Sequence, residues 1–92
     1  MSTVTDNTAR QRFELEIDGQ IVFADYRRQG DVVVVPHVEA PLALRGSGAS
    51  GQLMEGMLAL LRARGETIVP LCSYASDYIR RHTEHRDLLA ER

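Results

Sequence analysis

The sequence predicts one small α+β domain in two layers, in which an antiparallel meander is followed by a helix, a strand and a second helix. Three observations support this fold class. Apolar and acidic residues alternate before an Asp-Gly turn, apolar residues recur at helical spacing after a glycine-rich loop, and a short apolar run follows that helix. A chain of 92 residues suits a single domain of this kind.

The first elements along the chain form the meander. Residues 1–10 are polar without periodicity, so we expect a flexible N-terminal tail there, followed by the compact domain at 11–92. The alternation over 12–17 predicts a half-buried strand. Asp18-Gly19 is a tight-turn signal, and the next strand, about 20–28, should therefore pair antiparallel with the first.

A third strand is predicted after a turn at 29–31. Four consecutive valines, 32–35, predict a central strand that is buried on both faces. Pro36 interrupts this run, and because proline has no amide hydrogen for the sheet ladder, we expect a bulge or a strand edge there. The strand can resume through 37–40 and end at Pro41.

An amphipathic helix is predicted over about 50–64, and Gly65 is suited to end it. Its apolar residues recur three and four positions apart, which places them on one face. This stripe consists of Leu53, Met54, Met57, Leu58 and Leu61.

The remaining residues predict one more strand and one more helix. Residues 67–72 form a short apolar run, typical of a buried strand. Ser73 can cap a second helix, about 74–82. We expect residues 82–92 to form a polar tail with one apolar pair, Leu88-Leu89.

Charge and composition exclude several classes of protein. The net charge is −2 without a basic run, so no nucleic-acid partner is expected. One cysteine excludes an internal disulfide and a cysteine-based zinc site, and a single thiol suits a reducing compartment. No segment has the apolar length of a membrane span or of a secretory signal, so we expect a cytoplasmic protein. His82 and His85 have a weak metal spacing without a third ligand, and no metal site is expected.

Gly46, Gly48 and Gly51 spell G-x-G-x-x-G, the pattern of a dinucleotide-binding loop. That fold needs a parallel strand-helix-strand unit and an acidic residue roughly 20 positions further on, and this sequence predicts neither. The loop also lacks the Gly-Lys-Ser/Thr ending of an ATP-binding P-loop. Its glycines still expose backbone amides at a helix N-terminus, which suits a phosphate or diphosphate. The alternative is a turn that only starts the helix.

The order of the elements together with this loop resembles the GNAT N-acetyltransferase superfamily. Residues 45–50, Arg-Gly-Ser-Gly-Ala-Ser, are similar to its acyl-CoA signature Q/R-x-x-G-x-G/A, with Ser50 in place of the final Gly or Ala. Over about 13–89 the chain looks like a compact GNAT-like branch of predicted acetyltransferases. The matching segments are His37–Pro41, Leu44–Gly48, Arg62–Gly65, Val69–Tyr74 and Tyr78–Glu84.

The resemblance implies an acetyl-CoA-dependent N-acetyltransferase with a GNAT-like fold. In that family the strand before the loop binds the pantetheine arm through its backbone, which here implies Val38, Glu39 and Ala40. The diphosphate would bind beside Arg45. It would accept hydrogen bonds from the amides of Gly46, Ser47, Gly48, Ala49 and Ser50.

The same resemblance points to three candidate catalytic residues. Cys72 resembles the cysteine characteristic of the compact branch and is either a nucleophile or a small buried residue. His37 could act as a base for Cys72 or for the acceptor amine, or be structural, and Tyr78 could protonate the departing thiolate or be part of the core. Glu39 and Tyr74 are weaker candidates for the same kinds of role.

The acceptor is an amine that the sequence leaves unidentified. Full-length GNAT enzymes carry two helices after their first strand, whereas here the Asp18-Gly19 turn leads straight to the second strand. We therefore expect an open acceptor side, suited to a large or flexible substrate such as a protein or peptide. Two alternatives remain: an acyl-CoA-binding or interaction module without turnover, and a structural domain whose loop binds nothing. The sequence gives no oligomeric state.

Overall fold

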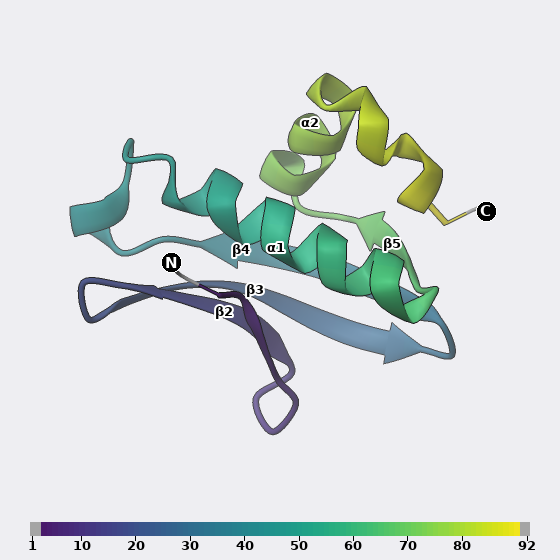
Figure 1. The fold of residues 1–92 in the computed structure, drawn as a ribbon, viewed down its shortest axis with the longest axis horizontal. Coiled ribbons are helices and arrows are strands. Elements are labelled where there is room, and N and C mark those ends of the chain that lie inside the picture. Colours follow the sequence, from purple (N-terminus) through teal and green to yellow (C-terminus); the bar gives the residue numbers. More distant parts are fainter. Residues whose placement is uncertain (1–2, 91–92) are drawn as a thin grey trace.

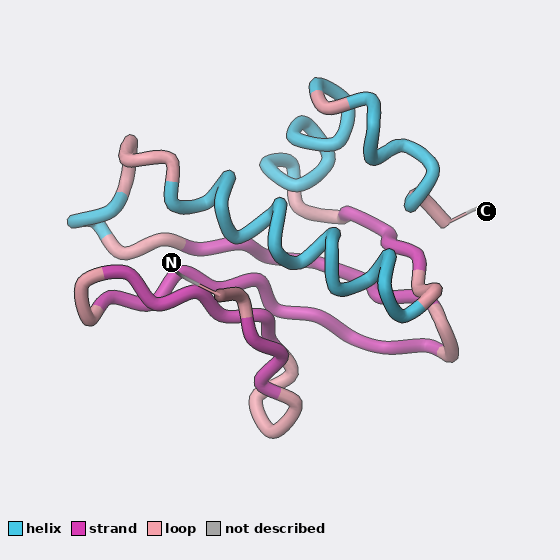
Figure 2. The backbone as a smooth tube through the Cα atoms, viewed as in Figure 1, coloured by secondary structure: helices cyan, strands magenta, loops and turns pink. Residues whose placement is uncertain are grey.

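The computed structural model describes residues 3–90, which fold into a five-stranded sheet with two α-helices on one side (Figures 1 and 2). The strands are β1 (Thr5–Asn7), β2 (Arg12–Ile17), β3 (Gln20–Gln29), β4 (Val32–Glu39) and β5 (Thr67–Pro70). The helices are α1 (Ala49–Arg64) and α2 (Ser73–Arg81), with short 3-10 helices η1 (Leu42–Leu44) and η2 (Thr83–Leu88). This arrangement confirms the predicted α+β fold class.

The sheet is a meander with one parallel strand at its end. Its order is β1-β2-β3-β4-β5, and all neighbours are antiparallel except β4 and β5. Asp18 and Gly19 both have positive φ values, 50° and 77°, as a two-residue hairpin with the twist of the flanking strands requires. The sheet turns parallel at β5 because α1 carries the chain back across it before β5 begins.

The predicted bulge lies at Pro36. Between Asp25 and Arg27 of β3 the register shifts, so that Tyr26 alone lies opposite Val35 and Pro36 of β4. An extra residue of this kind bends a strand and increases its twist. The second half of β4 is thereby turned relative to its first half.

Both helices cover the same face of the sheet, and their buried residues join those of the strands in one core (Figure 1). Val33 and Val35 of β4 point into this core and are fully buried. Val32 and Val34 point to the opposite face and are only partly buried. The expectation that β4 is buried on both faces is therefore wrong, because no helix among the described residues covers the outer face.

Helix α1 has the boundaries and the buried stripe that the sequence predicts. It begins after Gly48 and ends at Gly65, whose φ is 70° and whose amide donates to the carbonyls of Leu61 and Arg62. All five residues of the stripe are fully buried. Helix α2 differs slightly from prediction, because Cys72 rather than Ser73 is its N-cap residue and makes no side-chain capping bond.

The N-terminal segment is ordered from residue 4, in contrast to the predicted flexible tail. Val4 is 7% exposed, and residues 5–7 form β1 at the edge of the sheet. A Cβ placed on Gly56 of α1 would lie only 2.2 Å from a methyl carbon of Val4. The glycine thus allows this segment to pack directly on the helix, a contact that sequence periodicity does not reveal. Residues 1–2 of the predicted tail lie outside the described residues.

The C-terminal segment is also more ordered than predicted. Residues 83–88 form η2, Leu88 is buried, and the amide of Ala90 donates to the carbonyl of Ile68 in β5 at 2.9 Å. The expected polar tail is therefore a packed element as far as residue 90, and residues 91–92 lie outside the described residues. Within 3–90, no helix has the length and apolarity that crossing a membrane requires.

Candidate functional site

Strands β4 and β5 separate at the level of Val35, which creates an opening in the sheet. The Val35 carbonyl accepts hydrogen bonds from the amides of Leu71 (2.9 Å) and Cys72 (3.2 Å), just beyond the last residue of β5. Beyond this point β5 turns away into α2, whereas β4 continues past its bulge to Glu39. The second half of β4 therefore has a neighbour on one side only, namely β3.

Val38 presents its backbone groups to this opening. Alternate residues of an antiparallel ladder bond to opposite neighbours. The Tyr26 amide donates to Gln11 on the β2 side, so the odd-numbered residues of this part of β3 bond toward β4. Their partners on β4 are His37 and Glu39. The amide and carbonyl of Val38 therefore point away from β3 and remain available to an extended ligand.

The glycine loop at the start of α1 holds several backbone amides without protein partners. Gly46 and Gly48 have φ values of 80° and 86°, conformations that L side chains rarely adopt. The Ser47 amide donates to Leu44 (3.1 Å), and the Ala49 amide donates to the Ser47 hydroxyl (3.3 Å). Among the described residues, no acceptor lies within hydrogen-bond reach of four further amides, those of Gly46, Gly48, Ser50 and Gly51.

These free amides form a site with positive character. The first turn of α1 contains no acidic residue, and its N-cap residue is Gly48, which has no side chain, so no negative charge compensates the dipole of this 16-residue helix. Arg45 lies beside the loop and donates from Nε to the carbonyl of Ala40 at 3.2 Å, which connects the loop to the end of β4. This arrangement can hold an anion such as a diphosphate.

A hollow of about 260 Å³ lies over the loop. Loop residues and one aromatic side chain from α2 line it: Leu44, Gly46, Gly48, Ala49, Ser50, Gly51 and Tyr74. Helix α2 therefore contributes to the lining of this hollow through Tyr74. Tyr74 is more than twenty positions away from the loop in the sequence.

Cys72 lies where β5 ends and α2 begins. It is partly buried, packs against the core and is a free thiol. Its carbonyl accepts the first hydrogen bond of α2, from the amide of Ser76 at 2.9 Å.

His37 forms a pair with Glu39 on the outer face of the sheet. The His37 Nε2 atom lies 3.0 Å from Glu39 Oε1, and both side chains are about half exposed. The imidazole also contacts the ring of Phe23 edge-on, with 6.3 Å between ring centroids. Val38 packs toward the core, so its neighbour His37 points to the opposite face. The structure thus pairs His37 with Glu39 and does not bring it to the core-facing Cys72.

Tyr78 is buried and its hydroxyl donates to Glu55 of α1. Burial raises the pKa of Tyr78 far above its usual value, and the neighbouring carboxylate of Glu55 raises it further. Glu55 also lies 2.9 Å from Nε2 of His85, and the ring of His82 stacks on Tyr78 with 3.9 Å between centroids. The proton of Tyr78 is therefore held between α1 and α2.

Sequence reasoning did not predict two features of this region. Glu55 was not singled out, because its role depends on the packing of α2 against α1. Tyr74 was only a weak candidate, although its spacing of four from Tyr78 indicates that both rings lie on one face of α2.

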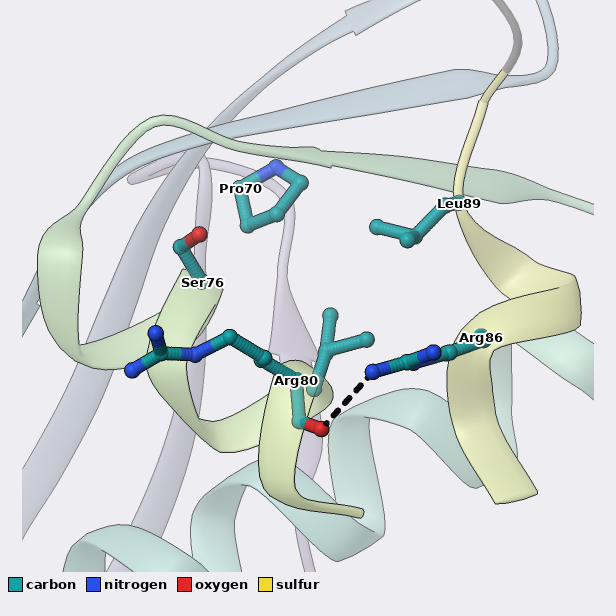
Figure 3. A pocket seen from close by; sticks show the side chains of 6 residues that line it. Pro70, Ser76, Arg80, Arg86 and Leu89 are labelled. Carbon is teal, nitrogen blue, oxygen red and sulfur yellow. Dashed lines mark hydrogen bonds between the residues drawn. The ribbon is translucent and has the colours of Figure 1, made fainter. Parts of the chain in front are cut away.

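A second hollow, of about 320 Å³, lies on the other side of α2 (Figure 3). Its lining is apolar with two arginines at the rim: Pro70, Ser76, Ile79, Arg80, Arg86 and Leu89. Arg80 donates to Asp77 (2.8 Å), and Arg86 donates to the carbonyl of Arg80 (3.3 Å). No residue of the glycine loop lines this hollow, so it is separate from the anion site.

Residues 3–90 contain no group of three or more histidine, cysteine or acidic residues that could hold a metal ion. In a comparison with known protein families, residues 12–88 match the model described as GCN5-related N-acetyl-transferase. This match covers β2 to η2 and includes the opening, the loop and, apart from Leu89, the residues that line the two hollows. No curated protein matches the chain.

Proposed function

The chain belongs to the GCN5-related N-acetyl-transferase family, and we propose that it transfers an acetyl group from acetyl-CoA to an amine. One observation carries this proposal above all. The opening between β4 and β5 lies next to a loop whose free amides and positive helix end fit a diphosphate. An extended ligand with a diphosphate at one end fits both features together.

The residues present fit coenzyme A. The diphosphate would bind at the loop amides of residues 46–50 beside Arg45, and the pantetheine arm would pair with Val38 in the segment 38–40. Two of the implied donors, the amides of Ser47 and Ala49, already have protein partners, so the free amides of Gly46, Gly48 and Ser50 are better placed. When bound, acetyl-CoA supplies a thioester carbonyl that a neutral amine can attack.

His37 is the candidate base for the acceptor amine. Imidazole is the side chain that most often serves as a general base in enzymes. Glu39 fixes the ring orientation and stabilises the imidazolium that forms when His37 accepts the proton. This pair lies on the open outer face of the sheet, where a large or flexible acceptor such as a protein or peptide can approach.

Cys72 and Tyr78 have more restricted roles in this proposal. Cys72 lies on the core side of the opening and could accept the acetyl group from acetyl-CoA, whose CoA portion would leave as the free thiol with the Cys72 proton, before the amine receives the group. Tyr78 would have to exchange its bond with Glu55 before it could protonate a leaving thiolate. We also propose a cytoplasmic location, since a free, partly exposed thiol suits a reducing compartment.

A module that binds acyl-CoA without turnover is the second candidate. It is favoured by the separation of His37 and Cys72 on opposite faces and by the engagement of Tyr78 with Glu55. This module would keep the loop and the opening but would lack a working acid-base set.

The first experiment tests binding by isothermal titration of the protein with acetyl-CoA. The second follows the release of free CoA, with and without a lysine-containing peptide, for the wild type, His37→Ala and Cys72→Ala. We expect His37→Ala to lower turnover by about 100-fold with unchanged affinity, the usual contribution of a general base. Binding without turnover in the wild type would favour the module, and no binding would exclude both candidates.

A further inference from the structure

Tyr74 and Tyr78 lie one turn apart on α2, and both rings reach the first turn of α1. A Cβ placed on Gly51 would lie 3.7 Å from Cε2 of Tyr78 and 3.9 Å from the hydroxyl oxygen of Tyr74. The two rings are 6.3 Å apart between centroids. The residues are therefore close neighbours of the same chemical type, but their hydroxyls have different surroundings.

The Tyr78 hydroxyl is fully engaged within the protein. It donates to Glu55, which also contacts His85, and the Tyr78 side chain is buried at 6% exposure. These contacts join α1, α2 and η2. Tyr78 thus has the surroundings of a residue that holds the helices together.

The Tyr74 hydroxyl lies at the hollow over the glycine loop. Tyr74 lines this hollow together with the residues whose amides are free, and it is the one lining residue that α2 contributes. Within residues 3–90 its hydroxyl makes no hydrogen bond to protein. Partial burial raises the pKa of Tyr74, so its phenol keeps its proton at neutral pH and remains a donor.

We propose that the Tyr74 hydroxyl donates a hydrogen bond to the diphosphate of coenzyme A, from the α2 side of the site. This inference rests on the proposed function, because it assumes that the loop binds the coenzyme. The free amides all belong to the loop and the first turn of α1. A donor from α2 would add a contact from a second element and make the position of α2 part of coenzyme recognition, while Tyr78 keeps that helix in place.

The test compares Tyr74→Phe with Tyr78→Phe, each of which removes one oxygen atom from the same helix face. Isothermal titration with coenzyme A should give an affinity about tenfold lower for Tyr74→Phe, because a hydrogen bond to a charged group is lost. Tyr78→Phe should bind within about twofold of the wild type but unfold at a lower temperature, since Glu55 loses one of its two hydrogen-bond partners. Equal affinities of the wild type and Tyr74→Phe would overturn the inference.

Phosphorus NMR of the bound coenzyme identifies which phosphate is involved. In Tyr74→Phe, the two diphosphate resonances should differ from those in the wild-type complex, whereas the 3′-phosphate resonance should not. A change confined to the 3′-phosphate would contradict the assignment to the diphosphate. A wild-type protein that binds no coenzyme A would instead refute the proposed function, so the two failures are distinguishable.

Discussion

The two ends of α1 differ in whether their polar groups have partners within the protein. At its N-terminal end, four amides lack protein acceptors among the described residues, and no acidic side chain balances the helix dipole. At its C-terminal end, Gly65 closes the helix by donating to two carbonyls, and the adjacent charged side chains are paired. One end thus has unused binding capacity, and the other has almost none.

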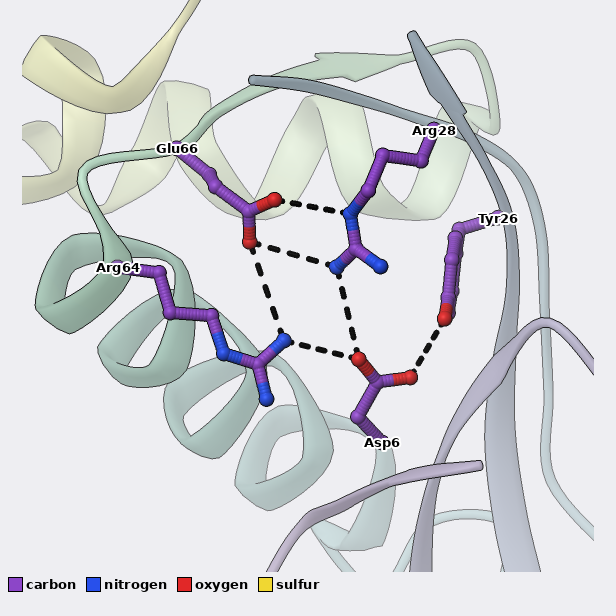
Figure 4. Close-up of polar contacts among 5 residues, drawn as sticks. All are labelled: Asp6, Tyr26, Arg28, Arg64 and Glu66. Carbon is purple, nitrogen blue, oxygen red and sulfur yellow. Dashed lines mark hydrogen bonds and ion pairs between the residues drawn. The ribbon is translucent and has the colours of Figure 1, made fainter. Parts of the chain in front are cut away.

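At the C-terminal end of α1, a network of five side chains joins this helix to β1 and β3 (Figure 4). Asp6 accepts hydrogen bonds from Tyr26 (2.6 Å), Arg64 (2.8 Å) and Arg28 (3.5 Å). Glu66 accepts from Arg28 at 2.8 Å and lies 3.9 Å from Arg64. Both carboxylates are nearly buried, at 6% and 11% exposure, and two arginines balance their charges.

The difference indicates what each end contributes. A buried charge that is fully paired stabilises the fold only while every partner is present. An unpaired amide at the surface adds nothing to stability and is available to a ligand. We therefore expect substitutions at the C-terminal end of α1 to change stability, and those at its N-terminal end to change coenzyme affinity.

The largest effect is expected from Gly56→Ala in the middle of α1, where the new methyl group would overlap Val4. We expect the free energy of unfolding to fall by about 3 kcal/mol, because overpacking displaces the N-terminal segment and with it Asp6. Urea unfolding monitored by circular dichroism measures the change. Gly51→Ala on the same helix is the control, since its Cβ meets only ordinary contacts. A Gly56→Ala protein as stable as the wild type would show that Val4 does not pack as described.

Asp6→Asn is the next largest change and removes one of the two negative charges of the network. The free energy of unfolding should fall by about 2 kcal/mol, because Arg28 and Arg64 lose a charged acceptor. Coenzyme A affinity should remain within about twofold of the wild type. A loss of affinity equal to the loss of stability would contradict the separation of the two ends.

The same substitution should also alter the response to acid. Burial acts to raise the pKa of Asp6, but hydrogen bonds from Tyr26 and Arg64 and the charges of Arg28 and Arg64 leave it below its usual 3.8. A lowered carboxyl pKa adds stability that is present above 3.8 and disappears as the pH falls through the folded-state value. The free energy of unfolding, measured at several pH values from 7 into the acid range, should therefore fall less steeply with decreasing pH for Asp6→Asn than for the wild type. The same pH dependence in both proteins would refute a lowered pKa at Asp6.

Gly48→Ala should affect only the N-terminal end of α1, and its effect on the free energy of coenzyme binding should be the smallest of these changes. An alanine at a φ of 86° strains the loop and reorients its free amides, so we expect coenzyme A affinity to fall about tenfold, or 1.4 kcal/mol. Gly30→Ala is the matched control, because Gly30 also has a positive φ and open space around its Cβ position but lies in the β3–β4 turn. Equal affinities of the two variants would show that the loop does not bind the coenzyme.

Much of the fold could be predicted because its signals are local. The Asp18-Gly19 turn, the bulge at Pro36 and the end of α1 at Gly65 each depend on one or two residues. The glycine loop was recognised in the same way. The sequence did not predict that β1 and η2 are regular, packed elements. Both segments are polar, and they are held in place by residues that are distant in the sequence. Glu55 was missed for the same reason, since its role depends on Tyr78 and His85.

The sequence by itself determined the meander, the position of the bulge and a loop that leaves amides free, because backbone geometry and periodicity are encoded within a few residues. Only the tertiary structure decided that His37 and Cys72 lie on opposite faces, that Asp6 reaches Arg64, and that Tyr74 rather than Tyr78 lines the hollow over the loop. The side chains in these relations come from separate elements. Their meeting depends on how the helices pack on the twisted sheet, which no short stretch of sequence specifies.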